Sequence, residues 1–212
     1  MEPLHAIWVT IGLFVLTFFN PGANLFVVVQ TSLSSGRRAG VCTGLGVALG
    51  DAIYSGLGLF GMVALMTQFE SLFSFIKIAG GLYLLWYAYG VVRNQNDVQI
   101  SALHTLIPGK GAVFFRRGLI TDLSNPQTVL FFISIFSVTL SANTPIWAKL
   151  LTWLGIVLSS ILWRIFLSQA FSLSAVRRAY SRIQRVASKI IGAVVGIFAL
   201  RLIYEGSREL SR

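Results

Sequence analysis

Three ionisable side chains, Asp51, Asp122 and Arg164, lie deep inside long apolar stretches of the sequence. Holding a charge at the centre of a bilayer costs at least about 2.5–3.5 kcal/mol, so such residues face a protein interior or a water-filled path. A carboxylate there can carry a proton, and a guanidinium can bind a carboxylate group. We therefore predict proton coupling by Asp51, with Asp122 as the second candidate. A buried ion pair between Asp51 and Arg164 that only holds the helices together is the alternative.

Two Asn-Pro pairs, Asn20-Pro21 and Asn125-Pro126, interrupt apolar stretches 105 residues apart. Proline removes a helical hydrogen bond and clashes with the preceding turn. In lipid such a break is tolerated only where it lines a cavity or is covered by protein. The half-helix that begins near Pro21 offers free N–H groups and a positive dipole end, which suit an anionic group. The breaks predict a binding site, although a packing kink is the alternative reading.

The residues predicted to bind a substrate flank these breaks and include the buried arginine: Pro21, Gly22, Asn24, Asn125, Pro126 and Arg164. Asn24 and Asn125 carry both donors and acceptors, so either can bind the amine or the carboxylate of a zwitterion. Acceptors for the amine are Asp122, freed backbone carbonyls or Asn125. Three phenylalanines follow the breaks within two turns, namely Phe26, Phe131 and Phe132. They predict a small cavity, which favours a small substrate side chain.

The composition requires a membrane to surround these residues. Of the 212 residues, 55% are hydrophobic and only 11% are charged, against about 25% charged in an average soluble domain. The mean hydropathy is +0.77. The net charge of +10 would suggest nucleic acid in a soluble protein. Here the charges fall between apolar runs, so membrane topology explains them better and no nucleic-acid partner is expected.

Six segments are long enough to cross a bilayer core of about 30 Å as helices of about 20 residues. They are expected at about residues 6–35, 39–66, 72–92, 113–140, 147–173 and 190–204. Lys77 lies near the start of the third segment, from where its side chain can reach the membrane surface. The fold class predicted is therefore an all-α integral membrane protein.

The loop charges orient these segments. Eleven basic residues fall on one side of the predicted bundle: Arg37, Arg38, Arg93, Lys110, Arg116, Arg117, Arg177, Arg178, Arg182, Arg185 and Lys189. Only Lys149, Arg201, Arg208 and Arg212 fall on the other. Basic loops stay in the cytoplasm, so both termini are expected outside, in the periplasm.

A polar linker at about residues 93–111 divides the chain, read as a single transmembrane domain 1–212, into halves at about 1–95 and 110–212. Three spans per half give the halves opposite orientations, which is the layout of an inverted-repeat transporter. The Asn-Pro pairs then fall in matching spans, the first and the fourth. Glycine pairs such as Gly40/Gly44 and Gly192/Gly196 favour close helix packing within the bundle, and a homodimer is left open.

Enzymatic chemistry is poorly supported. His5 and His104 have no partner at metal-ligand spacing, and Cys42 is the single cysteine, which excludes an internal disulfide and a cysteine metal cluster. The sequence has no Gly-rich phosphate loop followed by Lys-Ser/Thr. We therefore expect no catalytic residues, no metal, no cofactor and no ATP drive.

Three patches resemble the LysE/RhtB family of amino-acid exporters, and its threonine-efflux branch most closely. They are Asn20–Phe26 with the polar turn Gln30–Gly40, then Ala79–Trp86, and Phe115–Gln127. The resemblance runs over essentially the whole chain. It implies export of a small neutral amino acid such as threonine or homoserine across the bacterial inner membrane, driven by proton antiport.

The chain departs from that family at two positions. Ala23 stands where the family usually has a second proline, and Gln127 stands where it usually has lysine. Export of another amino acid or of a divalent cation, or a non-transporting role in membrane assembly, are the alternatives. A divalent cation site would need several carboxylate, cysteine or histidine ligands together, and the spans offer only Asp51 and Asp122.

Overall fold

The computed structural model describes most of the chain: residues 2–19, 22–68, 70–93, 109–141, 143–171, 189–190, 193–201 and 203–208. Side chains are described for all of these except 62–68, 70–74, 76–77, 87 and 91–92. Over these ranges all the regular structure is helical, as the composition predicts. Most of the predicted linker, residues 94–108, and the arginine-rich segment at 177–185 lie outside the described residues.

Seven labelled helices follow one another: α1 Pro3–Thr17, α2 Ala23–Ser35, α3 Arg37–Gln68, α4 Glu70–Arg93, α5 Gly111–Leu123, α6 Pro126–Thr139 and α7 Ile146–Ala170. Residues 193–201 and 203–208 are also helical. These ranges coincide closely with the predicted segments. The first and fourth segments are each divided into two helices, α1 with α2 and α5 with α6.

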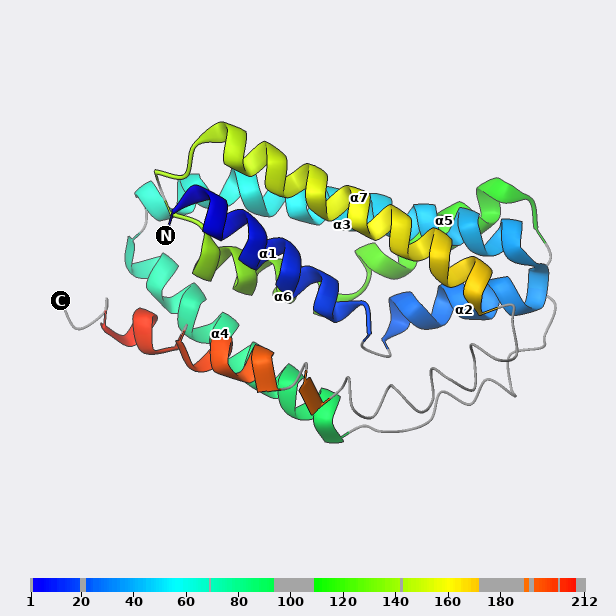
Figure 1. Ribbon diagram of the computed structural model, residues 1–212. Coiled ribbons are helices and arrows are strands. Elements are labelled where there is room, and N and C mark those ends of the chain that lie inside the picture. The colour runs from blue at the N-terminus through cyan, green and yellow to red at the C-terminus, as the bar shows by residue number, and fades with distance from the viewer. Residues whose placement is uncertain are drawn as a thin grey trace.

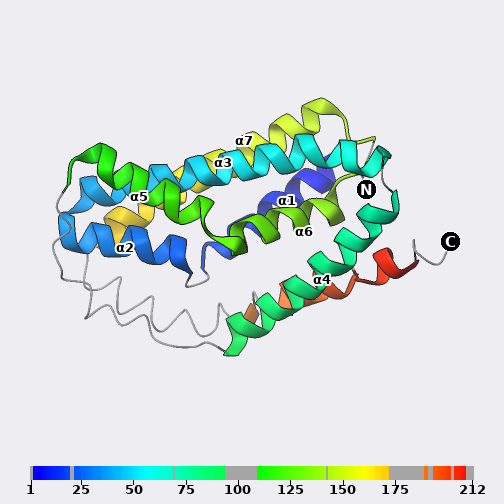
Figure 2. The same ribbon diagram turned by 180° about the vertical axis from the view of Figure 1, so that it is seen from behind.

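The undivided helices α3 and α7 run along the length of the bundle, and the divided segments pack beside them (Figure 1). Helices α1 and α6 lie together toward one end, and α2 and α5 lie together toward the other (Figure 2). Helix α4 packs mainly on α6, with the helical residues near the C-terminus alongside it. The two interruptions therefore meet in the middle of the bundle.

Glycines on α3 and α5 allow α3 to approach its neighbours closely. A Cβ atom added at Gly46 would collide with the backbone oxygen of Phe115 on α5, and one added at Gly118 would collide with that of Thr43 on α3. A Cβ atom at Gly44 would lie 2.7 Å from the Cβ of Arg164 on α7. Small residues are the usual means by which helices approach closely in lipid. Helix α3 is thereby held against both α5 and α7.

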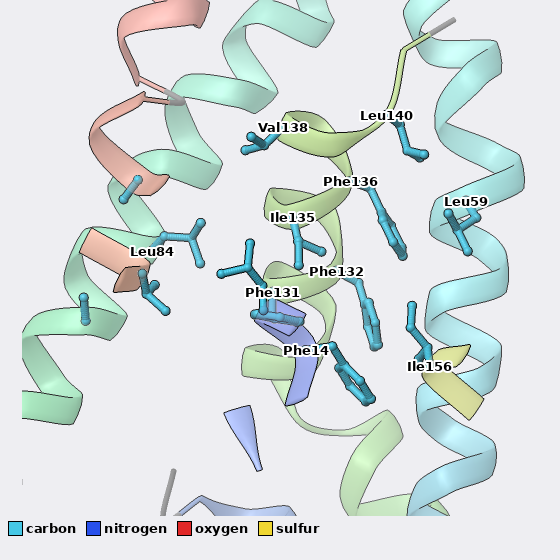
Figure 3. Close-up of a cluster of buried hydrophobic side chains, with 14 of the residues drawn as sticks. Phe14, Leu59, Leu84, Phe131, Phe132, Ile135, Phe136, Val138, Leu140 and Ile156 are labelled. Carbon is cyan, nitrogen blue, oxygen red and sulfur yellow. The ribbon is translucent and has the colours of Figure 1, made fainter. Parts of the chain in front are cut away.

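An aromatic core fills one half of the bundle, where α1 and α6 face α3 and α7. Phe14 stacks on Phe132 with ring centroids 5.5 Å apart, and Phe132 stacks on Phe136 at 5.6 Å. Figure 3 shows this column facing Leu59 of α3 and Ile156 of α7. All five side chains are less than 4% exposed. Such a packed core fixes the positions of the helix ends next to it.

The outer surface is apolar. Leu158 and Leu162 on α7, for example, are 57% and 67% exposed. Among the described residues, two stretches are long and apolar enough to cross a membrane, Arg37–Gly61 and Ile146–Ala170. A third is obtained if the bent pair α5 and α6 is counted as one span. The structure is that of a helical membrane protein, and six crossings remain a prediction.

Candidate functional site

The interruption between α5 and α6 has a defined local cause. Helix α5 ends at Leu123, α6 begins at Pro126, and the two are bent by 56°. Proline is suited to the first turn of a helix, where its missing N–H group costs nothing. The Asn125 side chain caps α6, because its Oδ1 accepts a hydrogen bond from the Gln127 backbone N–H at 3.0 Å. Asparagine is among the residues preferred for that role.

The interruption between α1 and α2 is built differently. Helix α1 ends at Thr17, and α2 begins at Ala23 after Gly22, which is in an extended conformation. No side chain caps α2 at Gly22. The predicted binding residue Pro21 and its neighbour Asn20 lie outside the described residues. Gly22, Asn24 and Leu25 line the cavity next to this helix end, so the N-terminus of α2 faces it.

A cavity of about 70 Å³ lies between the two interruptions. Its lining comes from α1, α2, α3, α6 and α7 and from the turns between the paired helices: Phe14, Thr17, Phe18, Gly22, Asn24, Leu25, Asp51, Asn125, Gln127, Thr128, Phe131, Phe132 and Arg164. Aromatic rings close it toward α1 and α6, and polar groups gather on the other sides. It is a polar cavity in the interior of the bundle, between residues far apart in sequence.

One polar group at the cavity is an ion pair between the two long helices. Asp51 on α3 is 2% exposed and Arg164 on α7 is 5% exposed. Their closest atoms, Asp51 Oδ2 and Arg164 Nη2, are 3.5 Å apart. Ser160, one turn before Arg164, donates a hydrogen bond to the same carboxylate oxygen at 2.6 Å. The predicted approach of Asp51 to Arg164 is therefore observed.

Aromatic rings pack against the arginine. The guanidinium carbon of Arg164 lies 5.7 Å from the ring centroid of Phe18, within the range of a cation–π contact. Phe18 in turn stacks on Trp163 at 5.4 Å with ring planes 7° apart. Phe18 therefore limits the movement of the guanidinium on one side.

A second polar cluster joins the two divided segments. Asn24 of α2 donates from Nδ2 to Asp122 Oδ1 of α5 at 2.5 Å and to Thr128 Oγ1 of α6 at 3.3 Å. Thr128 donates to Asp122 Oδ1 at 3.0 Å. Asp122 is fully buried and is not part of the cavity lining. Asn24 and Thr128 stand between it and the cavity.

Several buried polar atoms at this site have no hydrogen-bond partner among the described residues. The oxygens are Asn24 Oδ1 and Asp122 Oδ2, and the nitrogen is Arg164 Nε. Buried polar groups are normally satisfied by protein or by water, so each exception requires a partner from elsewhere. Of these, Asn24 Oδ1 and Arg164 Nε belong to residues that line the cavity. One acceptor and one cationic donor are the complement of a molecule that carries an ammonium group and a carboxylate.

Gln127 separates the cavity from a groove on its other side. Its side-chain oxygen lies 3.5 Å from the position that a Cβ atom on Gly22 would occupy. Gly22, Asn125 and Gln127 line the cavity and also the groove, which extends to Tyr83 and Trp86 on α4. We call these three residues the shared wall. Of its members, Gln127 has the longest side chain.

Most of the residues predicted from the sequence come together here. Gly22, Asn24, Asp51, Asn125 and Arg164 line the cavity, and Asp122 lies directly behind it. Pro126 lines the groove and not the cavity, because its side chain starts α6 on the side facing α4. The side chain of Lys77 lies outside the described residues.

One expectation about the cavity walls is wrong. Phe26 was expected to narrow the cavity, but it is 41% exposed and is not part of the lining. It lies two residues beyond Asn24, and a helix turns by roughly 200° over two residues, so the two side chains point in different directions. Phe131 and Phe132 do line the cavity as expected.

Sequence reasoning missed six cavity residues on the divided segments: Phe14, Thr17, Phe18, Leu25, Gln127 and Thr128. The sequence contains a signal for Thr17, because it precedes Asn20 by the three residues that separate Asp122 from Asn125. Phe14 and Phe18 are four residues apart and therefore share one face of α1. That face could be assigned to a cavity only after α6 and α7 had been placed against it.

Comparisons with known proteins agree with the assignment of the chain as a membrane protein. The family described as LysE type translocator matches residues 15–206. The uncharacterized membrane protein YahN of Escherichia coli strain K12 is 72% identical over 206 residues, covering 97% of this chain and 92% of that protein. Threonine efflux proteins of Salmonella typhi and Escherichia coli strain K12 are 29% and 28% identical over 192 residues, covering 89% of this chain and 93% of each relative. No solved structure matches the chain. The family match includes both interruptions, Asp51 and Arg164.

Proposed function

Since the chain belongs to the LysE type translocator family, whose members are transporters and not enzymes, we propose that it exports small neutral amino acids from the cytoplasm. Threonine and homoserine are the substrates proposed first, because relatives that cover 89% of the chain carry the name threonine efflux protein. Transport is secondary and exchanges the amino acid for protons across the bacterial inner membrane.

The observation that carries this proposal is the set of unpartnered atoms around the cavity. A zwitterionic amino acid supplies ammonium hydrogens for Asn24 Oδ1 and a carboxylate for Arg164 Nε. A guanidinium binds a carboxylate strongly because the hydrogen bond is assisted by charge.

The size of the cavity favours a small substrate. A buried water needs roughly 10–15 Å³ of such space, so a cavity of about 70 Å³ has room for about five waters. A compact amino acid displaces a similar volume. Phe131 and Phe132 line the cavity, and we expect them to exclude a long side chain such as that of arginine.

We assign the proton-carrying step to Asp51, with Asp122 as the reserve candidate. Asp51 borders the cavity and is paired with Arg164, the residue proposed to hold the substrate carboxylate. A substrate carboxylate that binds Arg164 competes with Asp51 for the same cation. That competition makes amino-acid binding and proton binding depend on each other, as proton antiport requires.

The overall arrangement proposed is one transmembrane domain of six spans, built as two inverted repeats of three. In it both Asn-Pro pairs, including Pro21, break their spans beside the substrate, and the site opens alternately to each side of the membrane. The basic loops lie in the cytoplasm and both termini in the periplasm.

Divalent cation export fits the same cavity less well. Cations of this kind need several oxygen ligands at once. Asp51 is the one acidic residue in the described cavity lining, and its carboxylate already faces the positive charge of Arg164. The Arg164 guanidinium, 3.5 Å from the Asp51 carboxylate, repels a cation that approaches the same carboxylate.

Counterflow in proteoliposomes tests the proposal. Vesicles loaded with unlabelled threonine should accumulate labelled threonine only when they contain the protein, and homoserine should compete with it. Manganese or zinc ions should not compete. Absence of counterflow with any small neutral amino acid would contradict amino-acid export, and an imposed proton gradient that leaves efflux unchanged would contradict antiport.

A further inference from the structure

While Asp122 is ionised, the hydrogen bonds around Asn24 have one consistent assignment. An ionised carboxylate has no hydrogen to donate, so Asn24 must turn its NH₂ group toward Asp122. The Thr128 hydroxyl donates its single hydrogen to the same carboxylate oxygen, at 3.0 Å. It can therefore only accept from Asn24 Nδ2, which lies 3.3 Å away. Both amide hydrogens of Asn24 are thereby engaged.

This assignment leaves the oxygen of Asn24 for something else. Asn24 lines the cavity, and its Oδ1 is buried and has no partner among the described residues. An asparagine can offer either a donor or an acceptor to a ligand, depending on how the amide is turned. Here the amide is held so that the group left over is the acceptor. An acceptor binds an ammonium group and disfavours a carboxylate.

Asp122 is placed so that it acts only through its neighbours. It is fully buried and packs against the backbone of Gly50 on α3, where a Cβ atom would collide with its carboxylate. It does not line the cavity, whereas Asn24 and Thr128 do. Its hydrogen bonds to these two residues link α5 to α2 and α6.

We propose that Asn24 Oδ1 receives the ammonium group of the substrate, and that Asp122 and Thr128 are positioning residues that hold the Asn24 amide in this orientation. The inference rests on the function proposed above and names the chemistry of one end of the site. It gives the two ends of the zwitterion different partners, because Arg164, which also lines the cavity, is proposed to hold the carboxylate. The protein should therefore discriminate an amino acid from the hydroxy acid of the same shape.

Competition with labelled threonine in counterflow tests this selectivity. The probes are unlabelled L-threonine and the matching 2,3-dihydroxybutanoate, in which a hydroxyl group replaces the ammonium group. The wild-type protein should bind threonine at least about tenfold more tightly, since a charge-assisted hydrogen bond contributes about that much. The selectivity ratio is the affinity for threonine divided by the affinity for 2,3-dihydroxybutanoate. Asp122→Leu frees the Asn24 amide to turn, so it should reduce the selectivity ratio about tenfold, mainly through weaker threonine binding.

Asp122→Asn is the conservative variant. Its side-chain oxygen can still accept from Asn24 Nδ2, so it should restore most of the selectivity ratio. A purely structural role for Asp122 would weaken both probes equally in either variant. An unchanged ratio in Asp122→Leu, or a wild-type protein that binds both probes equally, would overturn the inference.

Thr128→Val provides a second route if Asp122→Leu does not fold. Valine keeps the branched shape but removes the acceptor for the second amide hydrogen, so the ratio should fall about threefold or more. The matched control is Ser134→Ala, a buried hydroxyl on the same helix that bonds to Leu130 and Gly80 instead. An equal selectivity ratio in Thr128→Val and Ser134→Ala would contradict the positioning role.

A wild-type protein that counterflows no amino acid would overturn the proposed function, and the inference with it.

Discussion

The carboxylate of Asp51 lies 3.5 Å from the guanidinium of Arg164, and both side chains are buried. The pair joins α3 to α7, two helices that are far apart in the chain. Ser160 completes it with a hydrogen bond of 2.6 Å to Asp51. Because the pair also borders the cavity, we expect substitutions in it to change both the stability of the protein and its transport activity.

Breaking this pair should destabilise the protein strongly. Arg164→Leu leaves the Asp51 carboxylate buried without its cation, which costs about 3–5 kcal/mol of unfolding free energy. The double variant Asp51→Leu with Arg164→Leu removes both charges and should recover most of that loss. Thermal unfolding in detergent measures both.

The control for that experiment is an exposed pair on the C-terminal helical segment. Arg201 and Glu205 are 2.8 Å apart, and the Arg201 side chain is 54% exposed. Arg201→Ala should cost less than about 1 kcal/mol. Equal losses in Arg164→Leu and Arg201→Ala would mean that the interior pair is not a stabilising contact.

Asp51→Asn should uncouple transport from the proton gradient. An amide cannot carry a proton between the two sides, but it can still accept a hydrogen bond from Ser160. Efflux driven by an imposed proton gradient should be lost, whereas threonine counterflow should persist. Proteoliposomes prepared with and without the gradient separate the two activities. Full gradient-dependent efflux in this variant would exclude Asp51 as the carrier and leave Asp122.

Two substitutions at Asn125 separate helix capping from ligand binding. Asn125→Ala removes the acceptor for the Gln127 N–H group and should cost about 1 kcal/mol of stability. Asn125→Ser restores a capping oxygen and should regain most of it. If the amide also binds substrate, threonine affinity should stay low in both variants. Thermal unfolding and scintillation-proximity binding give the two readouts, and normal affinity in both would remove Asn125 from the binding site.

Gln127→Ala should widen the range of substrates. Gln127 is the longest side chain of the shared wall, so its removal opens the cavity toward the groove beside Tyr83 and Trp86. Leucine or phenylalanine should then compete with labelled threonine about tenfold better than in the wild type.

Gly22→Ala is the matched control for Gln127→Ala. Its added Cβ would lie 3.5 Å from the Gln127 oxygen, an ordinary contact that leaves the wall intact. Unaltered selectivity in Gln127→Ala would show that the wall does not limit substrate size.

Cysteine labelling tests the orientation predicted from the basic loops. In a Cys42→Ala protein, Lys110→Cys and Glu2→Cys place single thiols at two exposed positions. An impermeant maleimide added to intact cells should label position 2 and spare position 110. Labelling of position 110 with position 2 spared would show that the termini lie in the cytoplasm, the opposite of the predicted topology.

The sequence predicted the helices well, because their apolar stretches are long and bounded by polar residues. The predicted range 39–66 corresponds to α3 at Arg37–Gln68, and the range 147–173 corresponds to α7 at Ile146–Ala170. The approach of Asp51 to Arg164 could also be predicted, since a charge inside an apolar segment needs a partner.

The sequence was less informative about cavity walls and hydrogen-bond directions. Thr128 follows a recognisable Asn-Pro pair, but its bond to Asp122 depends on the 56° bend between α5 and α6. Phe26 was misplaced because distance along the chain was used where helical rotation decides the direction of a side chain. These features arise from packing between distant segments, which periodicity alone does not determine.

The glycine contacts between α3 and α5 have an entropic consequence. At Gly46 and Gly118 each helix presents bare backbone to the other, so bringing the helices together immobilises no side-chain torsions at those points. Burying a long side chain costs up to about 2 kcal/mol of rotamer freedom, and glycine costs none. In lipid, where helices gain no hydrophobic drive from meeting one another, that saving matters more than it does in water. The first and second halves of the chain are therefore joined along a seam that forms with little loss of side-chain motion.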